Sequence, residues 1–437
     1  MFDKKIHIQR RGKLALEMVN NSVALIEASS EKIRNNDAYY RFRQSSNFFY
    51  LTGFDKPNAF LMLIKKKNKV KSVFCSKKPN KHDEIWTGKL PSSKQIMNNY
   101  GFDACDYFES IEKIMRVNLE GISVIYHSLK EDTFIKKVFD DTISNLDKQY
   151  RKGVESPSQV YSLKKVLHKL RLVKDKDEIK NIRKATDISS KAHVELMKRC
   201  KPGLNEKDLE AGLIYNFNLN NATEAYTSIV ASGKNACILH YIDNSSKLKN
   251  GDLLLTDAAC EFNKYASDIT RTIPINGKFS KTQKIIYQIV LSAQEKAIAK
   301  CCIGNTLKDI HNEAVKILCK GLIEIGLLKV SYKEAIKSQV YKKFYMHNTG
   351  HWMGLDVHDP CDYMENEKPI ILKEGMVFTV EPGIYIRPDK SINKKYHNIG
   401  IRIEDDVLIT KNGPEVLTAV APKQIKDIEK MMSDKYV

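Results

Sequence analysis

The sequence predicts an α/β amino-terminal domain followed by an α+β domain with an internal pseudo-twofold repeat. Two observations carry this prediction. Residues 1–172 alternate short apolar runs, typical of strands, with helical stretches. Residues 173–437 open with a long amphipathic helix, expected from about Lys174 to Arg199, and contain one pattern of sequence twice. The segment ESPSQ at 155–159 interrupts the strand and helix pattern shortly before the predicted boundary.

Three apolar runs mark strands of the first domain. In chain order they are AFLMLI at 59–64, KSVFCS at 71–76 and ISVIYH at 122–127. The basic run KKKNKVK at 65–71 follows the first of them, and such a short polar stretch predicts a hairpin turn. Because helical stretches also occur between the strands, we expect an α/β domain with a mixed sheet.

The second domain repeats a pattern of helix, glycine, helix and strand. Ala192–Leu209 (AHVELMKRCKPGLNEKDL) matches Ala293–Ile310 (AQEKAIAKCCIGNTLKDI) at alanine, cysteine, glycine, lysine and aspartate positions. The strand-like segments GDLLLTD at 251–257 and GMVFTVE at 375–381 follow in the same order, and each ends in a carboxylate. Two such units packed about a pseudo-twofold axis would bring both carboxylates to their shared interface.

Composition and charge disfavour several classes of protein. The formal net charge of +19 comes from lysines spread along the chain among acids, which indicates a solvated surface rather than nucleic-acid binding. No apolar run approaches the roughly 18 residues of a membrane helix, and the start MFDKKIHIQRRGK lacks the apolar core of a signal peptide. Nine cysteines without CxxC spacing are expected to be reduced. We therefore expect a cytoplasmic protein without nucleic-acid or membrane partners.

Two aspartates, Asp257 and Asp268, lie in the stretch DAACEFNKYASDITRT directly after an apolar strand. A chain reversal at Phe262 and Asn263 would place them opposite one another on paired strands, with Cβ atoms about 4.5–5.5 Å apart. Like charges at this spacing destabilise the pair, so something positive must lie between them. A shared proton and a metal ion both meet this requirement.

Three further stretches favour a metal site. The stretch MHNTGHWMGLDVHD at 346–359 carries His347, His351 and His358, and its glycines predict a loop rather than a helix. In TVEPGIY, the proline that follows Glu381 holds its backbone extended. In GIRIEDDVLI, alternation with isoleucines places two charged residues on one face of a strand: Arg402 and Glu404. Taken singly, each feature also fits a packed histidine or an ordinary strand-edge charge.

Together these stretches supply four carboxylates and one imidazole as candidate metal ligands: Asp257, Asp268, His351, Glu381 and Glu404. Four ionised carboxylates neutralise two divalent cations, which favours metal ions over a shared proton. Ligation dominated by oxygen favours Mn²⁺, with Co²⁺ and Zn²⁺ as alternatives. Two such ions about 3.5–4 Å apart would bridge one water molecule, lower its pKa and polarise an electrophile.

These motifs resemble those of the pita-bread metallopeptidases, most closely the bacterial Xaa-Pro aminopeptidases (aminopeptidase P). The similar segments are LLTDAACEFNKYASDITRTIPINGKFS, HWMGLDVHD, TVEPGIYI, GIRIEDD and, near the amino terminus, RFRQSSNFFYLTGF. The resemblance covers essentially the whole chain. It implies an amino-terminal domain of the creatinase/aminopeptidase P type at 1–172 and a pita-bread catalytic domain at 173–437.

The resemblance implies an enzyme that releases the amino-terminal residue from peptides with proline in second position. Asp257 and Asp268 would share one metal ion. His351 and Glu381 would complete the other. Asp268 and Glu404 would bridge both ions, and a metal-bridging hydroxide would attack the scissile carbonyl while Glu381 handles the proton.

The resemblance also assigns residues around the metal ions. His240, in ILHY, and His358 would contact the substrate and stabilise the tetrahedral intermediate, with a structural histidine as the alternative. Arg402 would orient ligands or substrate, unless it is an ordinary strand charge. His347 fits a functional and a structural role equally well. Trp86, in DEIWTGK, would cap the proline ring from a neighbouring subunit of a dimer or tetramer, or else be a buried core tryptophan.

Three alternatives remain open on the sequence. A prolidase, which cleaves only Xaa-Pro dipeptides, shares the fold and ligands but needs a cation for the dipeptide's carboxylate, which the sequence does not locate. A methionine aminopeptidase is disfavoured by the long amino-terminal domain. A non-enzymatic binding protein of this fold would be expected to lose ligands, and all five are present here.

Overall fold

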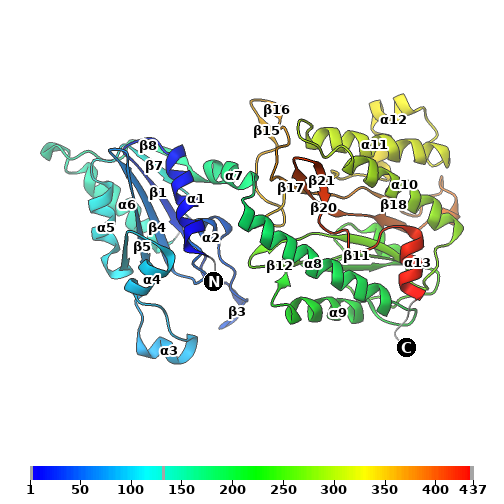
Figure 1. Ribbon diagram of the computed structural model, residues 1–437, viewed down its shortest axis with the longest axis horizontal. Coiled ribbons are helices and arrows are strands. Elements are labelled where there is room, and N and C mark those ends of the chain that lie inside the picture. Colours follow the sequence, from blue (N-terminus) through cyan, green and yellow to red (C-terminus); the bar gives the residue numbers. More distant parts are fainter. Residues whose placement is uncertain (1–2, 130–132, 434–437) are drawn as a thin grey trace. The chain divides into compact units, whose positions relative to one another are not determined.

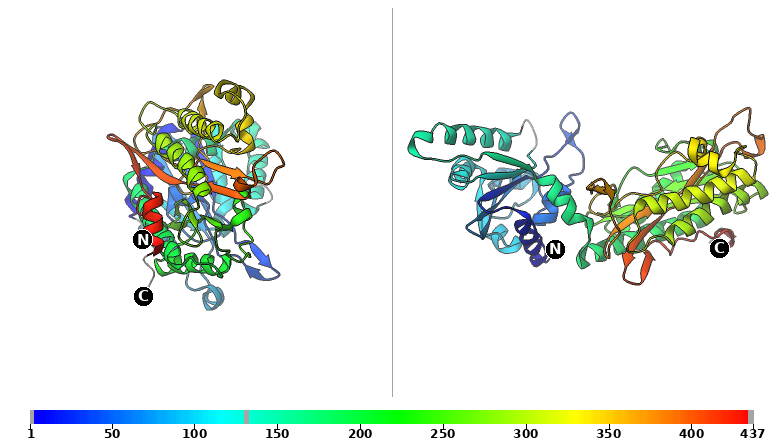
Figure 2. Two further views of the ribbon diagram at one scale, coloured as in Figure 1. Left: turned by 90° about the vertical axis from the view of Figure 1, so that its right-hand side faces the viewer. Right: turned by 90° about the horizontal axis from the view of Figure 1, so that it is seen from above.

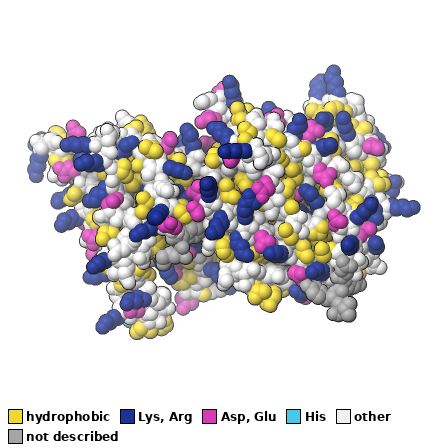
Figure 3. Space-filling model, viewed as in Figure 1, with side chains coloured by type: hydrophobic (Ala, Val, Ile, Leu, Met, Phe, Trp, Pro, Cys, Tyr) yellow, Lys and Arg dark blue, Asp and Glu magenta, His cyan; other side chains and the backbone are white. Residues whose placement is uncertain are grey.

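The computed structural model describes residues 3–129 and 133–433. The chain forms two compact units, Met1–Leu170 and Arg171–Val437, so the division lies two residues before the boundary expected after residue 172 (Figure 1). Within the described residues, no helix is both long and apolar enough to span a bilayer. On the face drawn in Figure 3, Lys and Arg side chains are spread among Asp and Glu, as the interleaved charges of the sequence predict.

The first unit is built on a six-stranded sheet in the order β6-β5-β4-β1-β7-β8. Its strands are β1 (Ser22–Glu27), β4 (Ala59–Lys66), β5 (Lys69–Ser76), β6 (Ala104–Tyr107), β7 (Val124–His127) and β8 (Gln159–Ser162). Strand β4 pairs antiparallel with β1 and β5, whereas β5 with β6, β1 with β7 and β7 with β8 are parallel pairs. The predicted mixed sheet is therefore confirmed. A separate small hairpin consists of β2 (Ile33–Asn35) and β3 (Ala38–Tyr39).

Helices accompany this sheet, and the apolar side chains of two of them share its core. The helices are α1 (Lys4–Glu17), α2 (Ser46–Thr52), α3 (Lys81–Thr87), α4 (Ser93–Tyr100), α5 (Ile111–Leu119), α6 (Phe134–Asp147) and α7 (Leu163–Leu172), which crosses the division. Met115 of α5 and Val138 of α6 belong to one buried cluster with Leu25 of β1. The predicted hairpin turn lies at Lys67 and Asn68, whose φ angles of 50° and 58° suit a two-residue turn.

The second unit contains the predicted repeat as two similar runs of elements. The first run is α8 (Lys176–Arg199), α9 (Glu206–Leu219), β10 (Ile229–Ser232), β11 (Leu253–Asp257) and β14 (Thr270–Pro274). The second is α10 (Lys281–Ile298), α11 (Leu307–Glu324), β17 (Val377–Val380) and β20 (Asp405–Thr410). In each run a central strand, β11 or β17, pairs antiparallel with a later strand, β14 or β20. The two helix pairs lie on opposite sides of the strands (Figures 1 and 2).

The two runs also match in backbone pairing at the start of the second helix. Asn205, the N-cap of α9, bridges to Lys247, and Thr306, the N-cap of α11, bridges to Ile371. Each bridge ties a helix start to the segment just before the central strand. The structure therefore confirms the predicted fold class, an α/β domain followed by an α+β domain with an internal repeat.

Shorter elements complete the second unit. They are β9 (Thr223–Glu224), β12 (Cys260–Phe262), β13 (Tyr265–Ala266), α12 (Tyr332–Ser338), β15 (Met364–Glu365), β16 (Lys368–Pro369), β18 (Gly383–Ile386), β19 (Ile399–Arg402), β21 (Gly413–Val416) and α13 (Ile425–Ser433). A 3₁₀ helix spans Gly233–Cys237, between β10 and β11.

The hairpin between β11 and β14 departs from the predicted register. Asp257 pairs with Thr270 rather than with Asp268. The chain reverses at Asn263 and Lys264, whose φ angles are 50° and 69°, one residue later than predicted. Moving the reversal by one residue moves the cross-strand partner by two, so the prediction that the two aspartates are directly opposed is wrong.

Candidate metal centre

A pocket of about 400 Å³ in the second unit collects the predicted site residues. Its lining includes all five predicted ligands: Asp257, Asp268, His351, Glu381 and Glu404. The other predicted residues of this unit line the same pocket: His240, His347, His358 and Arg402. Four lining residues were not predicted from the sequence: Leu239, Asn348, Gly350 and Tyr363.

Strand ends and connections supply the carboxylates. Asp257 is the last residue of β11, and Glu381 directly follows β17, the equivalent strand of the second run. Asp268 lies just before β14, and Glu404 lies between β19 and β20. The two strand-end carboxylates therefore face one pocket, which is the arrangement expected from the repeat.

The loop that carries His351 lies directly against β17. Thr379 N donates to His351 O at 3.0 Å, and Glu381 N donates to Thr349 O at 2.7 Å. A Cβ atom at Gly350 would lie 1.9 Å from the Thr379 carbonyl oxygen. Glycine at this position therefore allows the loop to pack on the strand. The segment is irregular apart from one bridging residue, as its glycines predict.

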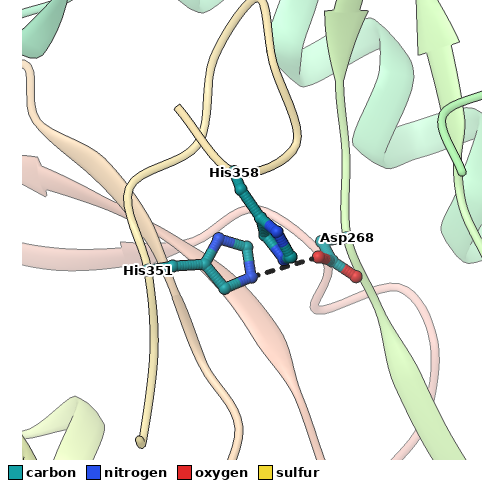
Figure 4. A group of neighbouring side chains, drawn as sticks. All are labelled: Asp268, His351 and His358. Atoms are coloured by element: carbon teal, nitrogen blue, oxygen red, sulfur yellow. Dashed lines mark ion pairs between the residues drawn. The ribbon is translucent and has the colours of Figure 1, made fainter. Parts of the chain in front are cut away.

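The donor atoms of these side chains converge. Among the described residues, three overlapping groups have donor atoms within 4.8 Å of one another. They are Asp257, Asp268 and Glu404; His351, Glu381 and Glu404; and Asp268, His351 and His358. Figure 4 shows the two histidines beside Asp268, with His351 Nε2 3.4 Å from a carboxylate oxygen. Because Glu404 belongs to the first two groups, the arrangement suits two ions with a shared ligand.

The carboxyl groups of the pocket are buried close together, which disfavours their ionised forms. Burial raises the pKa of Asp257 and raises that of Glu381 to about 7. Burial, with the nearby charges of Asp268 and Glu381, raises the pKa of Glu404 well above its ordinary value. Arg402 offsets part of this charge, since its Nη2 lies 2.5 Å from Asp257 Oδ2. The remaining shortage of positive charge and the oxygen-rich donor set both fit divalent metal ions.

The three histidines of the loop have different environments. Burial opposes charge on His351, but its hydrogen bond to Asp268 and the charge of that carboxylate raise the pKa to about 9. Burial lowers the pKa of His347 to about 4, and its Nε2 lies 2.9 Å from the Tyr385 hydroxyl. Burial and the charge of His351 lower the pKa of His358. A metal ion needs a neutral imidazole, so it would compete with the proton on His351.

Two polar side chains that hold the aspartates were not predicted. The Tyr226 hydroxyl lies 2.6 Å from a carboxylate oxygen of both Asp257 and Asp268. The Asp406 carboxylate accepts the Asp268 N–H at 2.9 Å. Nothing in the linear sequence marks Tyr226, since it lies outside every motif. Asp406 carried one signal, because it belongs to the acidic run that contains Glu404.

Trp86 is not among the residues that line this pocket. It lies in α3 of the first unit, and 77% of its surface is exposed. The alternative of a buried core tryptophan is therefore wrong. Its contact with a proline ring remains a prediction.

Comparison with known proteins identifies the family. Residues 7–126 match the aminopeptidase P N-terminal domain, and residues 180–411 match metallopeptidase family M24. The chain is 39% identical over 426 residues to the Xaa-Pro aminopeptidase of Escherichia coli, and the match covers 97% of this chain and 96% of that protein. Its fold is similar to that of proline aminopeptidase P II from Yersinia pestis (TM-score 0.95, 38% identity, 99% of this chain and 100% of that chain).

A second similar structure is that of a related enzyme with zinc and a reaction product bound. Zn-substituted Escherichia coli aminopeptidase P in complex with product has a TM-score of 0.96 and 38% identity, over 99% of this chain and 98% of that chain. These similarities confirm the resemblance found in the motifs. The chain belongs to metallopeptidase family M24, with the aminopeptidase P N-terminal domain ahead of the catalytic domain.

Proposed function

We propose that this protein is a metal-dependent aminopeptidase that releases the amino-terminal residue from peptides with proline in second position. The observation that carries the proposal is the convergence of five donor side chains on one pocket: Asp257, Asp268, His351, Glu381 and Glu404. Similarity over nearly the full length to Xaa-Pro aminopeptidases supports the substrate class.

The proposed cofactor is a pair of divalent metal ions. Asp257 and Asp268 would hold one ion, while His351 and Glu381 would hold the other. Glu404, which belongs to both donor groups, would join them together with Asp268. Carboxylate ligation favours Mn²⁺. Co²⁺ and Zn²⁺ stay alternatives, and the related Escherichia coli enzyme is described in a Zn-substituted form.

The bound ions would polarise the scissile carbonyl and activate a water molecule. Glu381 would accept a proton from the attacking water and deliver it to the proline nitrogen as the C–N bond breaks. His240 and His358, on the pocket wall, would stabilise the negative charge that develops on the carbonyl oxygen. Arg402 holds Asp257 in place through its short ion pair.

The proposal also covers the assembly of the enzyme and the compartment in which it works. Trp86 would cap the proline ring from a neighbouring subunit of a dimer or tetramer and shape the side of the pocket that faces the residues after proline. The nine cysteines all lie in the described part of the chain and are free thiols. Free thiols support work in a reducing compartment, the cytoplasm.

A peptide-length assay on metal-stripped protein reloaded with Mn²⁺ tests the function. The substrates are an Xaa-Pro dipeptide, a longer Xaa-Pro peptide and the matched longer peptide with alanine in place of proline. We expect Mn²⁺ to restore hydrolysis, the longer Xaa-Pro peptide to be cleaved at least as well as the dipeptide, and the alanine peptide to be cleaved poorly. Cleavage of the dipeptide alone would identify a prolidase, and a preference for the alanine peptide would refute proline specificity.

A further inference from the structure

The segment between β10 and β11 brings His240 to the pocket. Its backbone passes through the 3₁₀ helix Gly233–Cys237 and then presents Leu239 and His240 to the pocket wall. His240 itself is exposed. An irregular segment must be held by its neighbours if it is to place an exposed side chain reproducibly against a substrate.

A single carboxylate, that of Glu206, accepts hydrogen bonds from residues on both sides of His240. Glu206 is the first residue of α9 and is fully buried. Its Oε1 accepts hydrogen bonds from Ser232 N and Ser232 Oγ, each at 2.7 Å, and from Asn235 Nδ2 at 3.1 Å. Its Oε2 accepts from the Tyr241 hydroxyl and from Ser246 N, each at 2.8 Å. Bonds to an ionised acceptor are about twice as strong as neutral ones.

These donors lie on both sides of His240 in the sequence. Ser232 and Asn235 precede it, whereas Tyr241 is its direct neighbour and Ser246 follows. Glu206 therefore ties the part of the segment next to β10 to the part that follows His240. Asn244 adds a second tie, because it accepts from Val230 N at 2.9 Å and donates to Ser228 O at 2.8 Å. Arg387 holds the segment at a further point, because it donates to Cys237 O from Nε at 3.2 Å and from Nη2 at 3.0 Å.

The internal repeat indicates that the helix start does not itself require this carboxylate. In the matched segments of sequence, Leu307 occupies the place of Glu206. Leu307 also begins its helix, α11, and packs against an apolar cluster. Both helices have a capping box formed by neighbouring residues. The carboxylate is thus a feature of the half that carries His240, not of the shared scaffold.

We propose that Glu206 is a positioning residue that sets the place of His240 in the substrate pocket. The inference rests on the proposed function, in which His240 contacts the substrate. Glu206 acts through the backbone of residues 232–246. None of the hydrogen-bond partners named above is one of the five predicted metal ligands. Its effect should therefore fall on substrate turnover and leave the metal ions bound.

The test is the isosteric variant Glu206→Gln, measured in the wild-type and in the His240→Ala background. The amide nitrogen of Gln cannot accept, so two or three of the five donors lose their partner. We expect kcat/KM for a longer Xaa-Pro peptide to fall about tenfold, with metal content unchanged. In the His240→Ala background the same substitution should change kcat/KM by less than about twofold, because the residue through which it acts is gone.

A second readout follows the segment directly. Amide hydrogen exchange of peptides that cover residues 232–246 should accelerate in Glu206→Gln, in the metal-free and in the metal-loaded protein. The matched control is Gln283→Ala, which removes a buried side chain that bonds Gly251 O at 2.8 Å near the start of α10. This control should lower the melting temperature yet change kcat/KM by less than about twofold.

Two outcomes would decide against the inference. An equal loss of kcat/KM in both backgrounds would show a general structural role, and loss of metal would show an effect on the centre itself. If Glu206→Gln does not fold, Tyr241→Phe removes one of the same bonds and must show the same dependence on His240. A wild-type protein without activity on Xaa-Pro peptides would instead refute the proposed function.

Discussion

Single side chains differ sharply in how much the metal centre depends on them. The donor atoms of Asp257 and His351 lie inside the convergent groups, whereas those groups do not include His347. The ring of His347 instead lies 2.9 Å from the Tyr385 hydroxyl. Neighbours in the same loop can therefore have different functions, and alanine substitutions should separate them.

We expect Asp257→Ala and His351→Ala each to lose at least one metal ion and to lower activity about 100-fold or more, since removing even an outer partner costs 10–100-fold. His347→Ala should retain both ions. Metal content by mass spectrometry, together with a Mn²⁺ titration of each variant, measures the difference. Equal metal loss in His347→Ala and His351→Ala would mean that the ligand histidine is misassigned.

At the scale of elements, the decisive contact is that between the histidine loop and β17. Gly350→Ala would place a Cβ atom 1.9 Å from the Thr379 carbonyl oxygen, so the loop must move off the strand and take His351 with it. We expect Mn²⁺ affinity to fall about tenfold or more, as for the loss of an outer contact. Gly12→Ala in α1 is the control, because a Cβ atom there meets nothing within 4 Å. Unchanged affinity in Gly350→Ala would show that the loop tolerates the displacement.

The sequence predicted which residues lie at the strand ends better than it predicted how the strands pair. A carboxylate after an apolar run is visible in the sequence, so Asp257 and Glu381 were found. The register of β11 with β14 was not, because the left-handed turn uses Lys264, a residue type that gives no turn signal. The Tyr226 bonds to both aspartates arise from distant segments that only folding brings together.

At the scale of the whole molecule, the first unit carries exposed apolar side chains without an evident role in its own core. Trp86 is 77% exposed and its neighbour Ile85 is 82% exposed, both on the short helix α3. Two large apolar side chains exposed on one short helix favour contact with a partner. This supports the proposed role of Trp86 at the substrate site of a neighbouring subunit.

We expect Trp86→Ala to lower kcat/KM for longer Xaa-Pro peptides about tenfold, which corresponds to the loss of about 1.4 kcal/mol of transition-state binding. Activity on Xaa-Pro dipeptides should change less, and metal content should not change. Ile85→Ala is the matched control on the same helix and should retain the preference for longer peptides. A uniform loss over all peptide lengths would exclude the proposed contact, and the same effect in Ile85→Ala would show that the Trp86 ring has no particular role in it.

The crowded carboxylates of the pocket also link folding to metal supply. Ions that bind only the folded chain stabilise it. The free energy of unfolding rises by about 1.4 kcal/mol for each tenfold increase in free metal concentration above Kd at each ion site. The melting temperature of this protein should therefore act as a gauge of metal occupancy, low in a chelator and higher as an ion is titrated in. Cells short of the native ion would then hold less folded enzyme as well as less active enzyme, so metal scarcity would reduce its abundance through turnover of the unfolded chain.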